Sequence, residues 1–363
     1  MDISAFIFLS SGLFFGWALG ANNLANVFGT AVGTRMIRFT TAAAIGAVFV
    51  VLGAVISGSG TSETVGKLGS IDAPAGAFMA ALAAAVAVFM MTRAGLPVST
   101  TAAIVGAVVG WNLFSETWPD LDSLRSILIG LVVGPVLAAG FAMVLFVATR
   151  AALAAAKVHM VRLDMYTRLG LIVAGALGAY SLGASNVANV VGVFIETSPF
   201  TPFTIDGFLT ITPAQQLAVL GGLSIAIGAC TYSGKVMHTV GAGLFTLSPV
   251  AAWVVVMAHS IVLILFASRN LEAVLAGLGL PTIPLVPISS TEAIIGAVIG
   301  VALVKEAHNI RWYVLARITV GWVMTPVIAA VICFVGLFFL QNVFNQEVYL
   351  PAVGDAVETH QPG

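Results

Sequence analysis

Two stretches of this sequence are near copies of each other. Gly20–Asn26 reads GANNLAN and Gly183–Asn189 reads GASNVAN, each near the end of the first apolar segment of one half of the chain. A second pair follows in the same order, because Pro97–Gly110 and Pro287–Gly300 both begin P-[VI]-S-[ST]-T. Two motif pairs in the same order indicate an internal duplication. The chain should therefore fold as two related halves, as many secondary transporters do.

The composition places this duplication in a lipid bilayer. Hydrophobic residues make up 60% of the chain and charged residues 8%, whereas about a quarter of the residues of a soluble domain are charged. Apolar stretches of about 17 to 25 residues, enough to cross a bilayer, recur along the chain. The first begins at Ile3 with no basic residue before it, so we do not interpret it as a cleavable signal peptide. The pattern predicts an all-α polytopic membrane protein.

We expect about ten membrane segments, five in each half. In the first half they lie at 3–20 (continuing, with a break, to 34), 40–60, 73–92, 96–112 and 123–149. In the second half they lie at 167–182 (continuing to 195), 213–230, 249–268, 283–304 and 310–341. An odd number of crossings makes the second half enter from the opposite side. The fold class predicted is thus an inverted-repeat transporter with broken helices or re-entrant half-helices.

The distribution of basic residues predicts the orientation. With the N-terminus outside, most Lys and Arg residues fall inside, and only Lys67, Arg125 and Arg269 fall in outer loops. Both termini are then extracytoplasmic. We expect a first repeat at 1–150, a basic cytoplasmic linker at 151–166, a second repeat at 167–342 and a polar tail at 343–363.

The hydroxyl runs after Pro97 and Pro287 are candidate anion-binding residues. Each proline allows a helix to start nearby but not to run through it. Free N–H groups, the positive end of the helix dipole and several hydroxyl groups then suit an oxyanion. Alternatively, these hydroxyls only cap their own helices. The candidate residues are Ser99, Thr100, Thr101, Ser289, Ser290 and Thr291.

The asparagines of the first motif pair are candidate ligands for a coupling cation. Amide oxygens, together with backbone carbonyls freed at a helix break, are hard oxygen ligands that suit Na⁺. Interhelical hydrogen bonding is the alternative role of Asn in membranes. The candidate residues are Asn22, Asn23, Asn26, Asn186 and Asn189, with Na⁺ expected at Asn23, Asn26, Asn186 and Asn189.

The two duplicated motifs together resemble the signatures of the PiT inorganic phosphate transporters, a family that includes sulfate permeases. Gly234–Pro249 and Trp322–Pro326 extend the similarity. The resemblance implies a cation-coupled oxyanion symporter with inverted repeats, usually dimeric, that moves its substrate by an elevator-like or rocking motion. It also implies that the hydroxyl runs bind the anion and that the asparagines hold the cation.

The sequence departs from the family pattern at functional positions. Asn23 and Asn186 stand where the family usually has aspartate, so the affinity for a cation should fall or other groups should take over the coupling. The residue after each hydroxyl run, often His in the family, is Ala102 in one copy and Glu292 in the other. A carboxylate beside a membrane-buried site is costly unless protonated or paired, so Glu292 is a candidate proton carrier. Alternatively, it is an acidic residue favoured by the helix dipole.

These features predict a secondary transporter of an inorganic oxyanion, phosphate first and sulfate second, coupled to Na⁺ or H⁺. A passive anion channel is the alternative of another class. We expect no enzymatic activity, because no catalytic set is visible, and no cofactor other than the coupling ion. The net charge of −1 gives no indication of nucleic acid binding. The expected partners are phosphate or sulfate, membrane lipid and a second copy of the chain, in the plasma (inner) membrane of a prokaryote.

Overall fold

The computed structural model of the chain describes residues 3–205, 209–243, 247–305 and 312–350. The first half contains α1 (Ile3–Gly33), α2 (Phe39–Ser57), α3 (Ser59–Gly69), α4 (Pro74–Arg93), α5 (Thr100–Phe114) and α6 (Leu121–Ala156). The second contains α7 (Met160–Val191), η1 (Gly192–Phe194), β1 (Phe203–Ile205), β2 (Leu209–Ile211), α8 (Pro213–Gly243), α9 (Pro249–Leu265), α10 (Arg269–Gly277), α11 (Ser290–Val304) and α12 (Trp312–Asn342). The fold is helical, with one short antiparallel β-hairpin.

The expected fold class is confirmed, and the count of ten segments is approximate. Among the described residues, six helices are long and apolar enough to cross a membrane, or seven if α9 and α10, bent by 63°, form one span. Helices α5 and α11 are apolar but only 15 residues long, about 22 Å at 1.5 Å per residue. They are the half-length helices that the prolines predicted.

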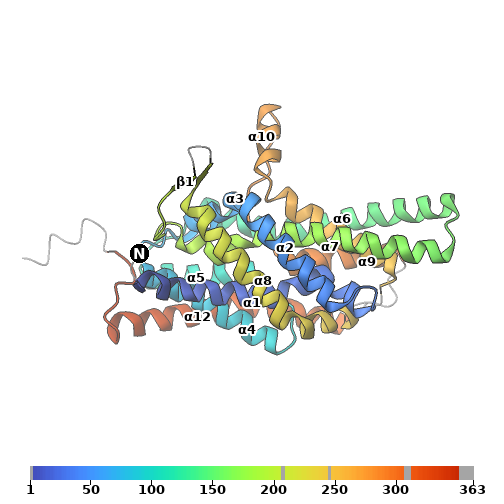
Figure 1. Cartoon of the computed structure of the whole chain (residues 1–363). Helices are drawn as coiled ribbons and strands as arrows, with labels where there is room; N and C mark the ends of the chain where they lie inside the picture. Colours follow the sequence, from blue (N-terminus) through green and yellow to red (C-terminus); the bar gives the residue numbers. More distant parts are fainter. Residues whose placement is uncertain (1–2, 206–208, 244–246, 306–311, 351–363) are drawn as a thin grey trace, which may run out of the picture.

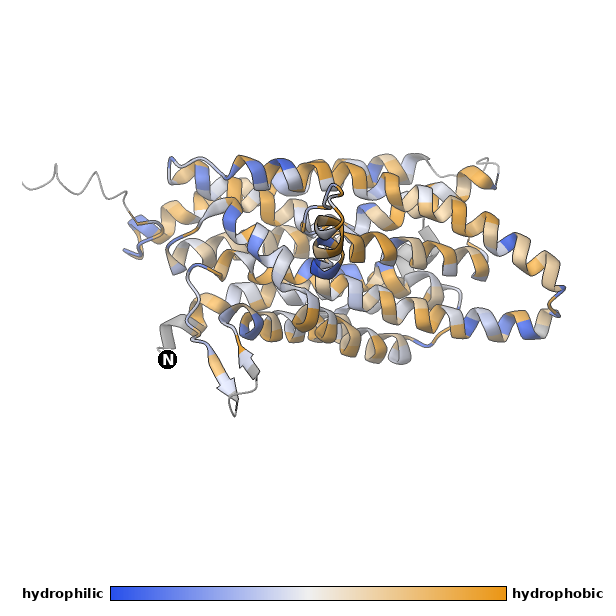
Figure 2. Cartoon of the chain, turned by 90° about the horizontal axis from the view of Figure 1, so that it is seen from above, coloured by the Kyte–Doolittle hydropathy of each residue, from blue (hydrophilic) through white to orange (hydrophobic). Residues whose placement is uncertain are grey.

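The halves are related in space as they are in sequence. Helix α1 packs on α8 as its counterpart α7 packs on α2, and α5 packs on α12 as α11 packs on α6. The start of α1 and the end of α12 lie at one end of the bundle, and the α6–α7 connection lies at the other (Figure 1). Hydrophobic residues cover much of the length of the long helices, while the α6–α7 connection is hydrophilic (Figure 2). This arrangement suits a bundle that crosses a bilayer along its long axis.

The predicted breaks at the asparagine motifs are wrong. Helices α1 and α7 continue through both motifs. The motif glycines serve close helix packing, because a Cβ at Gly20 would overlap the carbonyl oxygen of Ile225 and a Cβ at Gly183 would overlap that of Val50. The helices need no break to use their amides, because these side chains find partners on other helices. The backbone carbonyls at the motifs are therefore not freed by a helix break, and the motifs offer side-chain amides to the site instead.

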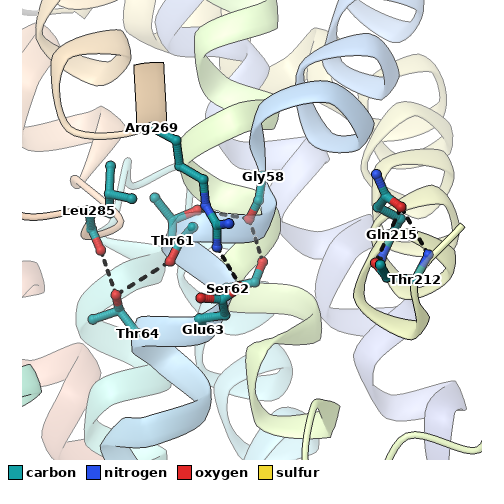
Figure 3. Close-up of polar contacts among 10 residues, drawn as sticks. Gly58, Thr61, Ser62, Glu63, Thr64, Thr212, Gln215, Arg269 and Leu285 are labelled. Carbon is teal, nitrogen blue, oxygen red and sulfur yellow. Dashed lines mark hydrogen bonds and ion pairs between the residues drawn. The ribbon is translucent and has the colours of Figure 1, made fainter. Parts of the chain in front are cut away.

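Two elements outside the ten expected segments contact each other. Helix α10 projects from the side of the bundle (Figure 1), and α3 lies beneath its start. Arg269, at the first position of α10, forms an ion pair with Glu63 of α3 (Figure 3). On the same helix, the hydroxyl group of Thr61 donates to the carbonyl oxygen of Ala184, 3.0 Å away. Helix α3 thus joins the base of α10 to the second asparagine motif.

Glycines set the closest contacts between the half-length helices and the opposite half. A Cβ at Gly106 of α5 would overlap the backbone of Pro326 in α12, and one at Gly296 of α11 would overlap that of Pro135 in α6. Both prolines lie inside their helices. The same glycine–proline contact therefore occurs twice between the halves. Each copy anchors one half-length helix to a long helix of the other repeat.

The variant Gly296→Ala should destabilise the protein. Its new methyl group must displace the backbone of α6, and overpacking of this kind costs about 1–3 kcal/mol. Thermal unfolding of the purified protein in detergent measures the effect. The matched control is Gly140→Ala, because no atom lies within 4 Å of a Cβ at Gly140, on the same long helix. An unfolding temperature as high for Gly296→Ala as for the control would contradict the packing assignment.

Candidate functional site

The two half-length helices begin in the same way. The extended segments that follow α4 and α10 end at Ser99 and Ser289, and each serine caps its helix. The Ser99 hydroxyl oxygen accepts from the N–H of Ala102 at 3.1 Å, and the Ser289 hydroxyl oxygen accepts from that of Glu292 at 3.3 Å. The capping interpretation is therefore correct for the first hydroxyl of each run. Each capping oxygen still carries its own O–H donor.

The other hydroxyls of each run contact the asparagine motif of the opposite half. The Asn26 amide nitrogen donates to Ser290 Oγ at 3.3 Å and to Thr291 Oγ1 at 2.9 Å. In the mirrored contact, the Asn189 amide nitrogen donates to Thr101 Oγ1 at 3.0 Å. All these side chains are buried. The structure thus brings the two predicted groups of residues into one site between the repeats.

Within each half, the motif also holds the backbone just after the proline. Asn22 Oδ1 accepts from the N–H of Val98 at 3.3 Å, and Ser185 Oγ accepts from that of Ile288 at 3.0 Å. Asn22 and Ser185 occupy the same motif position, so the serine makes in the second half the contact that the asparagine makes in the first. The Asn22 amide nitrogen also donates to Thr92 Oγ1 at 2.8 Å. Asn22 therefore fixes the start of α5, and its amide is the most fully engaged of the candidate cation ligands.

Three of the other asparagines have an unused oxygen. The Oδ1 atoms of Asn23, Asn26 and Asn189 are buried and have no hydrogen-bond partner among the described residues. The oxygen of Asn186 accepts from Asn189 at 3.2 Å. A buried acceptor without a partner costs about 1–3 kcal/mol, and native structures contain few. Three such oxygens on α1 and α7 fit a bound cation better than they fit interhelical hydrogen bonding alone.

His259, on α9, is a site residue that sequence reasoning missed. Its side chain is fully buried, and Nε2 lies 2.9 Å from Ser290 Oγ, whereas Nδ1 has no partner among the described residues. The signal in the sequence that could have identified it is its place within an apolar segment, because an ionisable residue within a membrane segment is functional by default.

Glu292 is also buried in this site. It is 6% exposed, and its backbone N–H donates to the Ser289 hydroxyl oxygen at 3.3 Å. The residue before it, Thr291, donates from its hydroxyl group to the carbonyl oxygen of Val98 at 2.9 Å, so Glu292 lies where the starts of α11 and α5 meet. The first repeat has Ala102 at the equivalent position. His259 and Glu292 together give the second half of the site a polar, ionisable character that the first half lacks.

Comparison with known proteins agrees with this architecture. The model of the family described as "Phosphate transporter family" matches residues 19–333 and 273–353. A protein of Methanocaldococcus jannaschii named "Putative phosphate permease" is 25% identical over 337 residues, which cover 92% of this chain and 97% of that protein. One of the same description from Pyrococcus abyssi is 26% identical over 411 residues, which cover 92% of this chain and 97% of the relative.

A solved structure shares the fold. The structure titled "The sodium-dependent phosphate transporter" superposes with a TM-score of 0.71 at 23% sequence identity, over 93% of this chain and all of that chain. The family model covers most of the sequence, including both asparagine motifs and both hydroxyl runs. The chain therefore belongs to the phosphate transporter family, which is a family of membrane transport proteins and not of enzymes.

Proposed function

We propose that this protein is a symporter of inorganic phosphate, with its anion site at the starts of α5 and α11. The observation that carries the proposal is the crossed contact between halves, in which Asn26 meets the hydroxyl run of α11 and Asn189 meets that of α5. This contact gathers two helix N-termini and two hydroxyl runs around one place. Free N–H groups and hydroxyls at a helix start suit a phosphate group.

The charges around the site also support an anion held by neutral donors. No described Lys or Arg side chain is buried, so the positive ends of two helix dipoles would balance the charge of the substrate. Helix starts that point at an anionic substrate near the middle of the bilayer are a recurrent feature of transporters with inverted repeats. Sulfate, a second oxyanion, is the alternative substrate.

We infer that Na⁺ is the coupling ion, held by Asn23, Asn26 and Asn189. Their three unpartnered oxygens are the observation that supports it. A cation there would also reduce the repulsion that the anion meets next to Glu292. Proton coupling is the second candidate, because Glu292 and His259 are both buried beside the hydroxyl runs. The resemblance further suggests a homodimer, and the distribution of basic residues suggests a plasma (inner) membrane protein with both termini outside. The start of α1 and the end of α12 lie at one end of the bundle, which is compatible with this orientation.

Uptake into proteoliposomes tests the coupling. Labelled phosphate should accumulate against its gradient when Na⁺ is imposed outside, and an imposed pH difference alone should drive less uptake. Accumulation driven only by the pH difference would replace Na⁺ with H⁺. Equilibration without accumulation under either gradient would identify a passive anion channel.

The double variant Ser99→Ala, Ser289→Ala should abolish phosphate uptake, because both hydroxyl donors at the helix starts are lost. The loss of each cap also costs helix stability, about 0.5–2 kcal/mol. The matched control is Ser248→Ala, Ser268→Ala, which removes the capping serines of α9 and α10. Uptake should persist in the control. Equal uptake by the two double variants, at equal protein levels, would disprove the anion site.

The double variant Asn23→Asp, Asn186→Asp should lower the Na⁺ concentration for half-maximal uptake, roughly tenfold, since a carboxylate neutralises the cation that an amide only ligates. The dependence of initial uptake rates on Na⁺ concentration measures the change. Asn342→Asp, an exposed position at the end of α12, is the control. An unchanged or weaker Na⁺ dependence in the double variant would exclude a cation near these positions.

A further inference from the structure

Glu292 is the one acidic side chain that is buried among the described residues. It is the third residue of α11, and Ser289 caps the helix, so the local sequence matches the S-x-x-E capping box. In a capping box, the hydrogen bonds of the two side chains are made to the backbone of a single helix start. Here the residue before Glu292, Thr291, also contacts the other half, because its hydroxyl group donates to the carbonyl oxygen of Val98 at 2.9 Å and so places Glu292 where the two helix starts meet. A helix cap alone does not account for this contact.

The carboxyl group lies beside the position expected of a substrate. Ser99 and Ser289 use their oxygens as helix caps and have one O–H donor left each. Glu292 is buried beside these two helix starts. An oxyanion that accepts from both donors must therefore lie next to the protein's own carboxyl group.

A carboxylate and an oxyanion in contact repel each other strongly in a region of low dielectric constant. A proton between the two groups converts this repulsion into a short, charge-assisted O–H···O⁻ hydrogen bond. Phosphate near neutral pH carries such a proton, whereas sulfate carries none. The two anions have nearly the same size and shape, so this proton is the chemical difference that a carboxylate can detect.

We propose that Glu292 is the specificity-determining residue of the anion site, where its carboxyl group and the bound oxyanion share one proton. The site then accepts hydrogen phosphate and rejects fully deprotonated sulfate near neutral pH. This inference rests on the proposed function, because it requires that an oxyanion bind at the starts of α5 and α11. The first repeat, with Ala102 at the matching position, contributes no such acceptor.

Few other titratable groups surround Glu292 among the described residues. Helices α1 and α5 carry no charged residue, and α9 contributes His259, which contacts Ser290. Helix α6, which packs along α11, carries charges only toward its ends, at Asp122, Arg125 and Arg150. On the second repeat, Lys305 lies beyond the far end of α11. Within the part of the chain that the structure describes, His259 is thus the one other side chain near the site that could make sulfate binding depend on pH.

Binding of labelled phosphate and labelled sulfate to the purified protein in detergent, each at about pH 5.5 and about pH 8, tests the proposal. The wild-type protein should bind phosphate at both pH values and sulfate at least roughly a hundredfold more weakly at the higher pH, as expected of a site that requires a substrate O–H. Lower pH supplies the missing proton to Glu292, so sulfate binding should strengthen as pH falls.

In Glu292→Gln, sulfate should bind at least roughly tenfold more tightly at about pH 8 than in the wild type, and phosphate should lose its advantage. Phosphate itself titrates between these two pH values and sulfate does not, so the pH dependence is read from sulfate. Any pH dependence of sulfate binding that remains in this variant would come from His259. The control is Glu272→Gln on α10, which removes a carboxylate away from the site. If Glu292→Gln does not fold, Glu292→Ala provides the same comparison, because the first copy already has alanine at this position.

Equal sulfate affinity and equal pH dependence in the wild type and the Glu292 variants would overturn the proposal while leaving the phosphate site in place. Sulfate that binds the wild type as tightly as phosphate at about pH 8 would also overturn it. A wild-type protein that binds neither anion would instead refute the proposed function itself, together with this inference.

Discussion

The structure depends on a hydrogen bond between an amide and a hydroxyl that occurs twice. Asn26 of α1 donates to Thr291 of α11, and Asn189 of α7 donates to Thr101 of α5. A bilayer offers no water to satisfy these groups, so each bond must form within the protein or leave a polar group unsatisfied. The contacts fix where the two half-length helices begin, and they bring the halves into one site. The positions of the anion donors and of the free amide oxygens follow from them.

Much of this could be predicted from the sequence, because the duplicated motifs carry their own chemistry. Pro97 and Pro287 predict helices that start inside the membrane, and the adjacent hydroxyls predict their caps. The continuity of α1 and α7 could not be predicted. Asparagine in a membrane segment is compatible with a broken helix or with a straight helix that has polar neighbours. The choice depends on partners such as Thr92, 70 residues distant in sequence.

Contacts between residues far apart in sequence also explain the other omissions. His259 meets Ser290 only because α9 packs against α11, and no motif surrounds this histidine. Ser185 replaces an amide with a shorter hydroxyl and still receives the N–H of Ile288. The sequence alone indicates that the amide contact is lost, whereas the geometry shows the same bond that Asn22 makes to the N–H of Val98 in the first half. The asymmetry between the halves is thus concentrated in Glu292 and His259, on one side of an otherwise paired site.

The glycine contacts at Gly106 and Gly296 have a consequence for movement. Each joins the backbone of a half-length helix to a long helix of the opposite repeat, at Pro326 and Pro135, with no room for a side chain between them. Close backbone packing of this kind resists sliding, since even one methyl group would not fit. A rigid body that moves during transport must then contain α5 with α12, or α11 with α6. The boundaries of the moving parts therefore cut across the ancestral duplication, and neither repeat can travel as a unit by itself.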